Sequence, residues 1–203
     1  MKYHKIEGNI EGVPFILIPM SDLVNWRGFY LLDNESRYPD LKFGDQGFKI
    51  YDGDDFENPK TDWGFVICKM LKSQESPLLI EVRDFEVLLI DPTTYTAWEG
   101  YQIAVAQYKE TYYFVFHLEK DFEIDERSIE NIVTDMSLIS SLKWLITDNK
   151  IKLLHTTEHG LDRNNQIFAD IDIIPGTYQV DLFLQKSDYP SYAIYRMEQT
   201  TIK

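Results

Sequence analysis

Short apolar runs of strand length, separated by polar breaks, make up most of the chain. The run VPFILIPM (13–20) is bounded by prolines and has the character of a buried strand. PLLIEVRD (77–84) and FEVLLID (85–91) follow each other with an Arg-Asp break, which predicts two strands joined by a tight hairpin. WGFVICKM (63–70) is dense in apolar and β-branched residues, and we expect a strand there too.

The second half of the chain shows the same kind of pattern. TYYFVFHLE (111–119) is apolar on nearly both faces, which predicts a central or sandwiched strand. In GTYQVDLFLQ (176–185), apolar residues alternate with polar ones after a Pro-Gly turn, as in a strand with one buried face. Further strands are expected in TYTAWEGYQIAVAQY, LKWLITD, KIKLLHT, IFADIDI and SYAIYRMEQ.

Helical signals are few and short. Ser21 or Asp22 can cap one helical turn that ends at Gly28. Apolar residues at 129, 132, 133, 136 and 139 have helical spacing, yet SLKWLI directly after them has the character of a strand, so the segment 128–145 stays open. Residues 33–62 are polar and rich in glycine and proline, which predicts a long irregular excursion with one short strand at FKIY (48–51).

These patterns together predict an α+β fold that is predominantly β, with antiparallel sheets in two β-rich halves and few short helices. The acidic segment 119–135 marks a shift in composition. We therefore place a boundary there, with a β-rich domain over 1–120 and a sandwich-like β module over 121–203.

The formal net charge of −14 narrows the classes of partner. A nucleic acid or an anionic membrane surface requires a basic face, so both are excluded as expected partners. A basic protein is the favoured partner, although the negative charge can also serve only to keep the chain in solution. The single cysteine, Cys68, lies in an apolar run and is expected in the core. The chain shows no secretion signal and no membrane-spanning run, so we expect a cytoplasmic protein.

The stretch HTTEH (155–159) matches the H-x-x-E-H pattern of inverted zinc peptidases. That pattern places both histidines on one face only if the segment is helical. Alternating apolar residues before His155 and the β-branched pair after it favour a strand running into a turn at Gly160. A metal-dependent enzyme that uses His155 and His159 is therefore kept as an alternative, and no metal or other cofactor is expected.

Acidic and aromatic side chains together are the usual ingredients of a protein-binding surface. They concentrate in the segments 45–62 and 119–130, which we expect to be the contact surfaces. The candidate partner-binding residues are Trp26, Tyr51, Asp52, Asp54, Asp55, Glu57, Asp121, Glu123, Asp125 and Glu126. YDGDDFEN (51–58) resembles a calcium-binding loop but lacks its glycine at the sixth position and its glutamate at the twelfth.

Three segments resemble one bacterial family. EGVPFILIPMSDLVNWRG, TDWGFVIC and LLIEVRDFEVLLIDPTTYTAW are similar to the immunity protein family numbered twenty-one, which is found beside polymorphic toxins. The resemblance covers roughly residues 8 to 118, and the chain departs from it at Val13 and in the segment 33–62. WLITDNKIKLL and ADIDIIPGTYQVDLFL resemble the end of the competence-associated nuclease inhibitor of bacilli.

Both resemblances imply stoichiometric inhibition of a toxic enzyme rather than catalysis. The leading hypothesis is an immunity protein that binds a cognate basic toxin, in the nuclease case by mimicking nucleic acid with its acidic surface. The alternatives are the metal-dependent enzyme named above and an adaptor or structural protein without a toxin partner.

Overall fold

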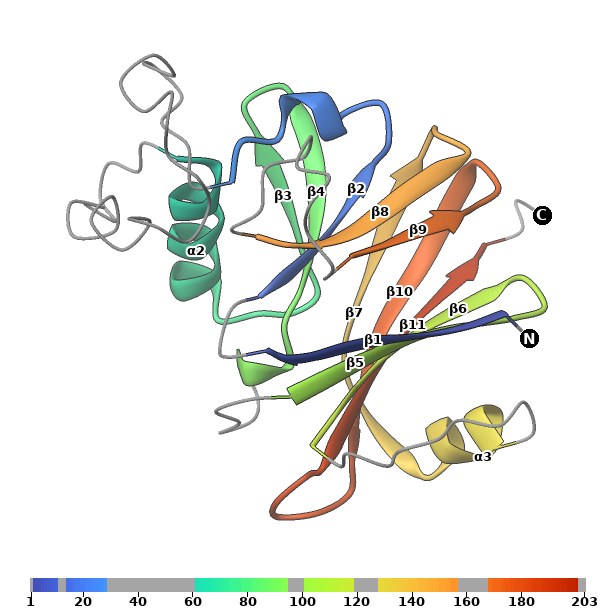
Figure 1. Ribbon diagram of the computed structural model, residues 1–203. Helices are drawn as coiled ribbons and strands as arrows, with labels where there is room; N and C mark the ends of the chain where they lie inside the picture. The colour runs from blue at the N-terminus through green and yellow to red at the C-terminus, as the bar shows by residue number, and fades with distance from the viewer. Residues whose placement is uncertain are drawn as a thin grey trace.

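The computed structural model describes residues 2–10 (backbone only), 14–28, 61–94, 101–118, 128–156 and 168–200. Two antiparallel sheets form its centre (Figure 1). The larger sheet has the order β1 (Lys2–Ile10), β5 (Tyr101–Tyr108), β6 (Thr111–His117), β11 (Tyr192–Gln199), β10 (Gly176–Gln185) and β7 (Met136–Ile146). The smaller has the order β3 (Leu78–Val82), β4 (Phe85–Ile90), β2 (Phe15–Pro19), β8 (Lys150–His155) and β9 (Phe168–Asp172). The predominantly β, α+β class predicted from the sequence is confirmed.

The main core lies between the two sheets. Alternate side chains of β6 enter it, and Phe116 stands near its centre, with its ring 6.1 Å from Phe15, 5.2 Å from Tyr101 and 5.5 Å from Tyr195. The rings meet edge to face, which is the arrangement that aromatic quadrupoles prefer. The intervening residues of β6, Tyr113 and Val115, are buried on the opposite face. The predicted sandwiched character of this strand is therefore confirmed.

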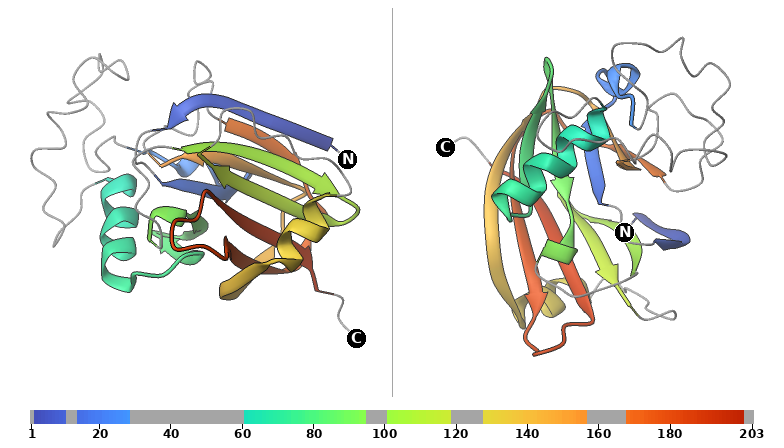
Figure 2. Two further views of the ribbon diagram at one scale, coloured as in Figure 1. Left: turned by 90° about the horizontal axis from the view of Figure 1, so that it is seen from below. Right: turned by 90° about the vertical axis from the view of Figure 1, so that its left-hand side faces the viewer.

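Within the described residues, one helix packs on each outer face, which gives four layers (Figure 2). Helix α2 (Asp62–Ser73) packs Val66 against the outer side of the smaller sheet, where Trp26 and Leu89 are also buried. Helix α3 (Ser128–Thr134) packs Ile129 and Val133 against the outer side of the larger sheet. Burial on both faces explains why so many of the strands lack clean polar alternation.

The strand predicted over 63–70 is wrong, because this segment is helix α2. The Thr61 side chain caps the helix by accepting a hydrogen bond from the backbone N–H of Gly64 at 2.9 Å. At the other end, Gln74 adopts a left-handed conformation and closes the helix. Cys68 is buried, as predicted, but on this helix rather than on a strand.

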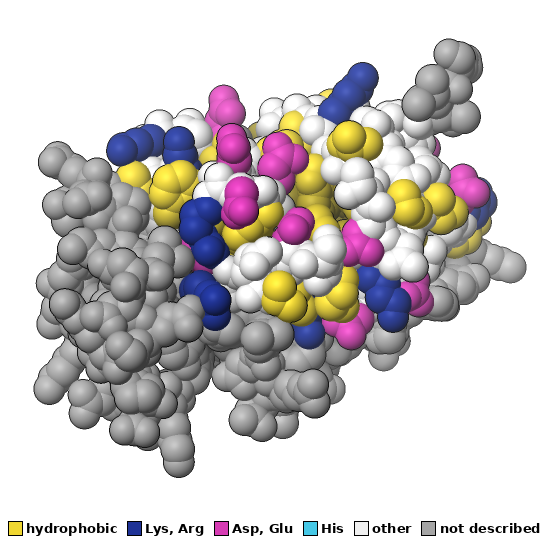
Figure 3. All heavy atoms as spheres, turned by 90° about the horizontal axis from the view of Figure 1, so that it is seen from above, with side chains coloured by type: hydrophobic (Ala, Val, Ile, Leu, Met, Phe, Trp, Pro, Cys, Tyr) yellow, Lys and Arg dark blue, Asp and Glu magenta, His cyan; other side chains and the backbone are white. Residues whose placement is uncertain are grey.

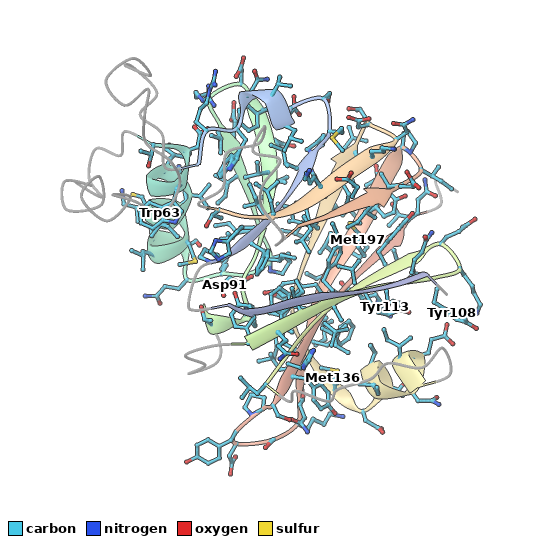
Figure 4. All side chains as sticks on the ribbon, in the orientation of Figure 1. Trp63, Asp91, Tyr108, Tyr113, Met136 and Met197 are labelled. Atoms are coloured by element: carbon cyan, nitrogen blue, oxygen red, sulfur yellow. The ribbon has the colours of Figure 1, made fainter. Side chains whose placement is uncertain are left out.

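The open segment 128–145 contains both kinds of structure. Helix α3 ends at Thr134, and β7 begins at Met136 beside the last residue of β10, Gln185. The pairing of β7 with β10 shifts between Leu182 and Phe183, so Ile139 is an extra residue without a direct partner across the ladder, as in a β-bulge. Figure 4 shows Met136 next to α3, at the turn from helix to strand.

Both sheets combine strands from the two sides of the boundary expected near residue 120. Strand β6 pairs with β11, and β2 pairs with β8. The main core likewise draws on both segments, for example Phe114 from the first and Trp144 from the second. The segments 1–120 and 121–203 are thus interleaved in the same sheets and the same core.

Candidate partner-binding surface

Most contact residues predicted from the sequence lie outside the described residues. This applies to Tyr51, Asp52, Asp54, Asp55, Glu57, Asp121, Glu123, Asp125 and Glu126, which stay predictions. Trp26 is described, and its side chain is 0% exposed within the core beneath α2. A fully buried indole offers no surface to a partner, so Trp26 is a core residue rather than a contact residue.

Asp62, counted from the sequence among the acids of the 45–62 segment, is also buried. Its carboxylate accepts hydrogen bonds from the Arg83 guanidinium at 2.8 Å and from the backbone N–H of Arg27 at 2.8 Å. Burial raises the pKa of Asp62, and the contacts with Arg27 and Arg83 act against that rise. The pair joins α2 to the turn between β3 and β4 and thereby fixes the position of the next residue, Asp84.

Three carboxylates converge beside this ion pair. Asp22 stands at the short 3-10 helix η1 (Leu23–Asn25), Asp84 in the β3–β4 turn and Asp148 in the β7–β8 turn. Burial and then the charges of Asp148 and Asp84 raise the pKa of Asp22. At Asp148 burial also acts to raise the pKa, but hydrogen bonds from the backbone N–H groups of Ser21 and Asn149, both 2.7 Å, outweigh it and lower the pKa.

The β3–β4 hairpin adds two more acids to this end of the molecule. Glu81 and Glu86 stand directly opposite each other across the ladder, and both are exposed. Like charges in such a pair repel each other. We call the set Asp22, Glu81, Asp84, Glu86 and Asp148 the acidic end. Acidic side chains gather on the corresponding face of the molecule, with some Lys and Arg among them (Figure 3).

Sequence reasoning missed the acidic end because its members are isolated in the chain. Asp22, Asp84 and Asp148 come from three separate turns, and none belongs to a run of acids. Only the order β3-β4-β2-β8 brings those turns together. The Arg-Asp hairpin was the one available signal, since it correctly predicted that Asp84 lies in a tight turn.

A second group of polar side chains is enclosed in the core. The Ser76 hydroxyl lies 2.6 Å from the Tyr195 hydroxyl and accepts a hydrogen bond from the backbone N–H of Asp91 at 3.0 Å. The Asp91 carboxylate accepts two hydrogen bonds from Thr93, and Figure 4 shows Asp91 where β4 ends. Ser76, Asp91 and Tyr195 are buried, so this group ties the sheets together instead of facing a substrate.

His155 does not have the geometry that a zinc-peptidase helix requires. It is the last residue of strand β8, and its ring packs edge to face on Phe15 with 5.4 Å between the ring centroids. Burial lowers its pKa to about 4. His159 lies outside the described residues. Within the described part of the chain, no three His, Cys, Asp or Glu side chains come close enough to hold a metal ion.

Comparisons with family models, with curated proteins and with solved structures each found no match. Among the described residues, none of the helices combines the length and the apolar character needed to cross a membrane.

Replacing Asp22 by Asn tests the cost of an ionised carboxyl at this site, to which burial and the charges of Asp148 and Asp84 contribute. A raised pKa means that the ionised carboxyl is less favourable in the folded chain than in the unfolded one. The variant should therefore be more stable at neutral pH, by a few tenths of a kcal/mol at this partly exposed site, and the gain should vanish as the pH falls below the ordinary pKa of Asp. Urea unfolding at neutral and acidic pH measures this. The exposed turn residue Asp188, changed to Asn, is the control, and an equal gain there would mean that the surroundings of Asp22 carry no particular cost.

Proposed function

We propose that this protein is an immunity protein that binds a basic protein toxin and blocks it, with the acidic end as a contact surface. The observation that carries the proposal is the gathering of like charges from three turns, where burial and then the charges of Asp148 and Asp84 raise the pKa of Asp22. Such an arrangement costs the free protein stability, and a partner of opposite charge removes that cost on binding.

The overall composition supports the same kind of partner. The net charge of −14 attracts basic proteins from a distance and repels nucleic acid and anionic lipid. The N-terminal segments resemble immunity proteins, and the C-terminal segments resemble a nuclease inhibitor. These resemblances support a toxic enzyme, such as a nuclease, as the partner. We also propose that the protein binds the toxin in the cytoplasm and inhibits it without catalysing a reaction itself.

The acidic end is also built rigidly enough to present its charges in a fixed pattern. The Asp62–Arg83 pair anchors the β3–β4 turn, and the backbone N–H groups of Ser21 and Asn149 orient the Asp148 carboxylate. Fixed charges lose little conformational entropy on association, which favours specific binding.

The direct test is co-purification of the tagged protein with the product of the adjacent gene, with binding followed across a salt series. We expect a tight complex that salt weakens. Asp84→Lys should slow association about tenfold, because it reverses a charge at the centre of the proposed contact. Asp188→Lys makes the same change in the β10–β11 turn at the other end of the molecule (Figure 1) and should leave association nearly unchanged. Equal effects of the two reversals would rule out the acidic end as the contact, and the absence of any complex would count against the immunity role.

A further inference from the structure

A pocket of about 240 Å³ opens where the β5–β6 turn meets the connection from β9 to β10. Its lining consists of Gln107, Lys109, Glu110, Tyr112, Asp172, Ile173, Ile174 and Tyr178. Tyr112 and Tyr178 extend from the inner faces of β6 and β10, and their rings meet edge to face with centroids 6.3 Å apart. Both residues are almost fully buried, so the pocket has a rigid base between the sheets.

Hydrogen-bond acceptors dominate this pocket. The Tyr112 hydroxyl donates to the backbone carbonyl of Asp172 at 2.8 Å and accepts from the Gln107 side-chain amide at 3.3 Å, and the Tyr178 hydroxyl donates to the backbone carbonyl of Ile174 at 2.7 Å. A hydroxyl that has used its only proton can offer a ligand only its lone pairs. The Glu110 carboxylate adds negative charge and has no ion-pair partner among the described residues, whereas the Asp172 carboxylate lies 3.7 Å from the Lys150 ammonium.

The one cation in the lining is already engaged. The Lys109 ammonium lies 3.5 Å from a carboxylate oxygen of Glu130 on α3 and 4.6 Å from the centre of the Tyr108 ring. An anion would therefore meet carboxylates and hydroxyl lone pairs rather than a free positive charge. Burial raises the pKa of Tyr178 to about 12, and smaller contributions from Tyr112 and Glu110 act in the same direction.

We infer that this pocket binds a guanidinium or primary ammonium group. The cation would donate to the Tyr178 hydroxyl and to the Glu110 carboxylate, and its methylene stem would lie along Ile174, whose side chain is 54% exposed. Two kinds of ligand carry such a cationic group: an arginine or lysine side chain displayed by a protein, and a free small amine. The inference goes beyond the proposed function and does not depend on it.

The test uses small probes and backbone amide chemical shifts of Glu110, Ile174 and Tyr178. Nα-acetylarginine methylamide stands for a displayed side chain, agmatine for a free amine, and Nα-acetylcitrulline methylamide is the neutral control of the same shape. We expect saturable shifts with a Kd on the order of 1 mM for at least one cationic probe and none for citrulline. Binding of the arginine probe alone identifies a displayed side chain as the source, and binding of agmatine alone identifies a free amine.

Two variants and a control complete the test. Glu110→Gln and Tyr178→Phe should each weaken binding about fivefold to tenfold, since each removes one acceptor of a charged donor. Glu75→Gln removes an exposed carboxylate elsewhere and should change nothing. Thermal unfolding of Tyr178→Phe checks that the pocket still forms. Equal binding of citrulline, or no shifts with either cation, would overturn the inference. Because no toxin is involved, either result is independent of the outcome for the immunity role.

Discussion

A fragment ending at residue 120 is expected to remain unfolded. It retains β6 but lacks β11, the strand that pairs with β6 along its whole length from Thr111 to His117. It retains β2 but lacks β8, and it loses core side chains such as Trp144 and Tyr195. Each large core side chain is worth about 3 to 5 kcal/mol when it is removed, so the loss of several exceeds the whole stability of an ordinary domain.

Circular dichroism and urea unfolding provide the measurement for this prediction. Full-length protein should unfold in one cooperative transition, whereas the fragment 1–120 should show none. Co-expression with the complementary fragment 121–203 is the control, because the two should reassemble into a complex with the full-length spectrum. A cooperative transition in the isolated first fragment would instead mean that residues 1–120 form an independent domain.

Replacing Arg83 by Met should destabilise the protein by about 3 kcal/mol at neutral pH. The Asp62 carboxylate is fully buried, and without Arg83 the hydrogen bond that it keeps among the described residues is the one from the backbone N–H of Arg27. Removing one member of a buried ion pair leaves an uncompensated charge, which is more costly than losing an exposed pair. Methionine keeps much of the side-chain length. Like arginine it has a Cβ, so the backbone cost of the positive φ of 57° is common to both residues.

The stability that Arg83→Met loses should depend on pH. The pKa of Asp62 is already raised in the folded protein, and loss of Arg83 raises it further. The folded state then holds a proton that the unfolded state releases, so stability falls as the pH rises from the ordinary Asp value of 3.8 through the raised folded pKa. The difference between wild type and variant should therefore be small at acidic pH and largest at neutral pH.

Guanidinium unfolding at about pH 5 and about pH 8 measures both predictions for Arg83→Met. Lys150→Met is the matched control, because Lys150 and Asp172 form an exposed pair at 3.7 Å whose loss should cost below about 1 kcal/mol. A loss at Arg83 no larger than the control, or independent of pH, would mean that Asp62 does not depend on its partner.

The strand content was predictable because period and residue type agree along most strands. The alternation of Tyr178, Val180 and Leu182 correctly indicated a strand with one face in the core. Helix α2 was missed because Val66 and Ile67 are β-branched and Gly64 disfavours a helix. The spacing of Trp63, Val66, Ile67 and Met70 and the capping residue Thr61 were the signals that favour a helix over the same segment.

The candidate surface was harder to predict than the fold. A search along the chain finds runs of acids, and it therefore selected the segments 45–62 and 119–130. The acidic end and the pocket instead combine single residues from distant turns, such as Asp22 with Asp148 and Glu110 with Tyr178. Their proximity follows from strand order, which local sequence patterns do not contain. Trp26 and Asp62 were wrongly counted with the surface. They are of residue types that are common at contact surfaces, but the fold buries both in the interior.

The irregularity at Ile139 bears on how the protein avoids aggregation. Strand β7 is the last strand in the order of the larger sheet, and it exposes Leu138, Ile139 and Leu145, with between 40% and 62% of each side chain accessible. A long edge strand with exposed apolar side chains is a template on which another copy can add a strand. The extra residue breaks the regular spacing of backbone donors and acceptors along β7 and twists it locally, so an added strand cannot stay in register over its full length. Together with the repulsion between chains of charge −14, the bulge opposes the growth of fibrils from this edge.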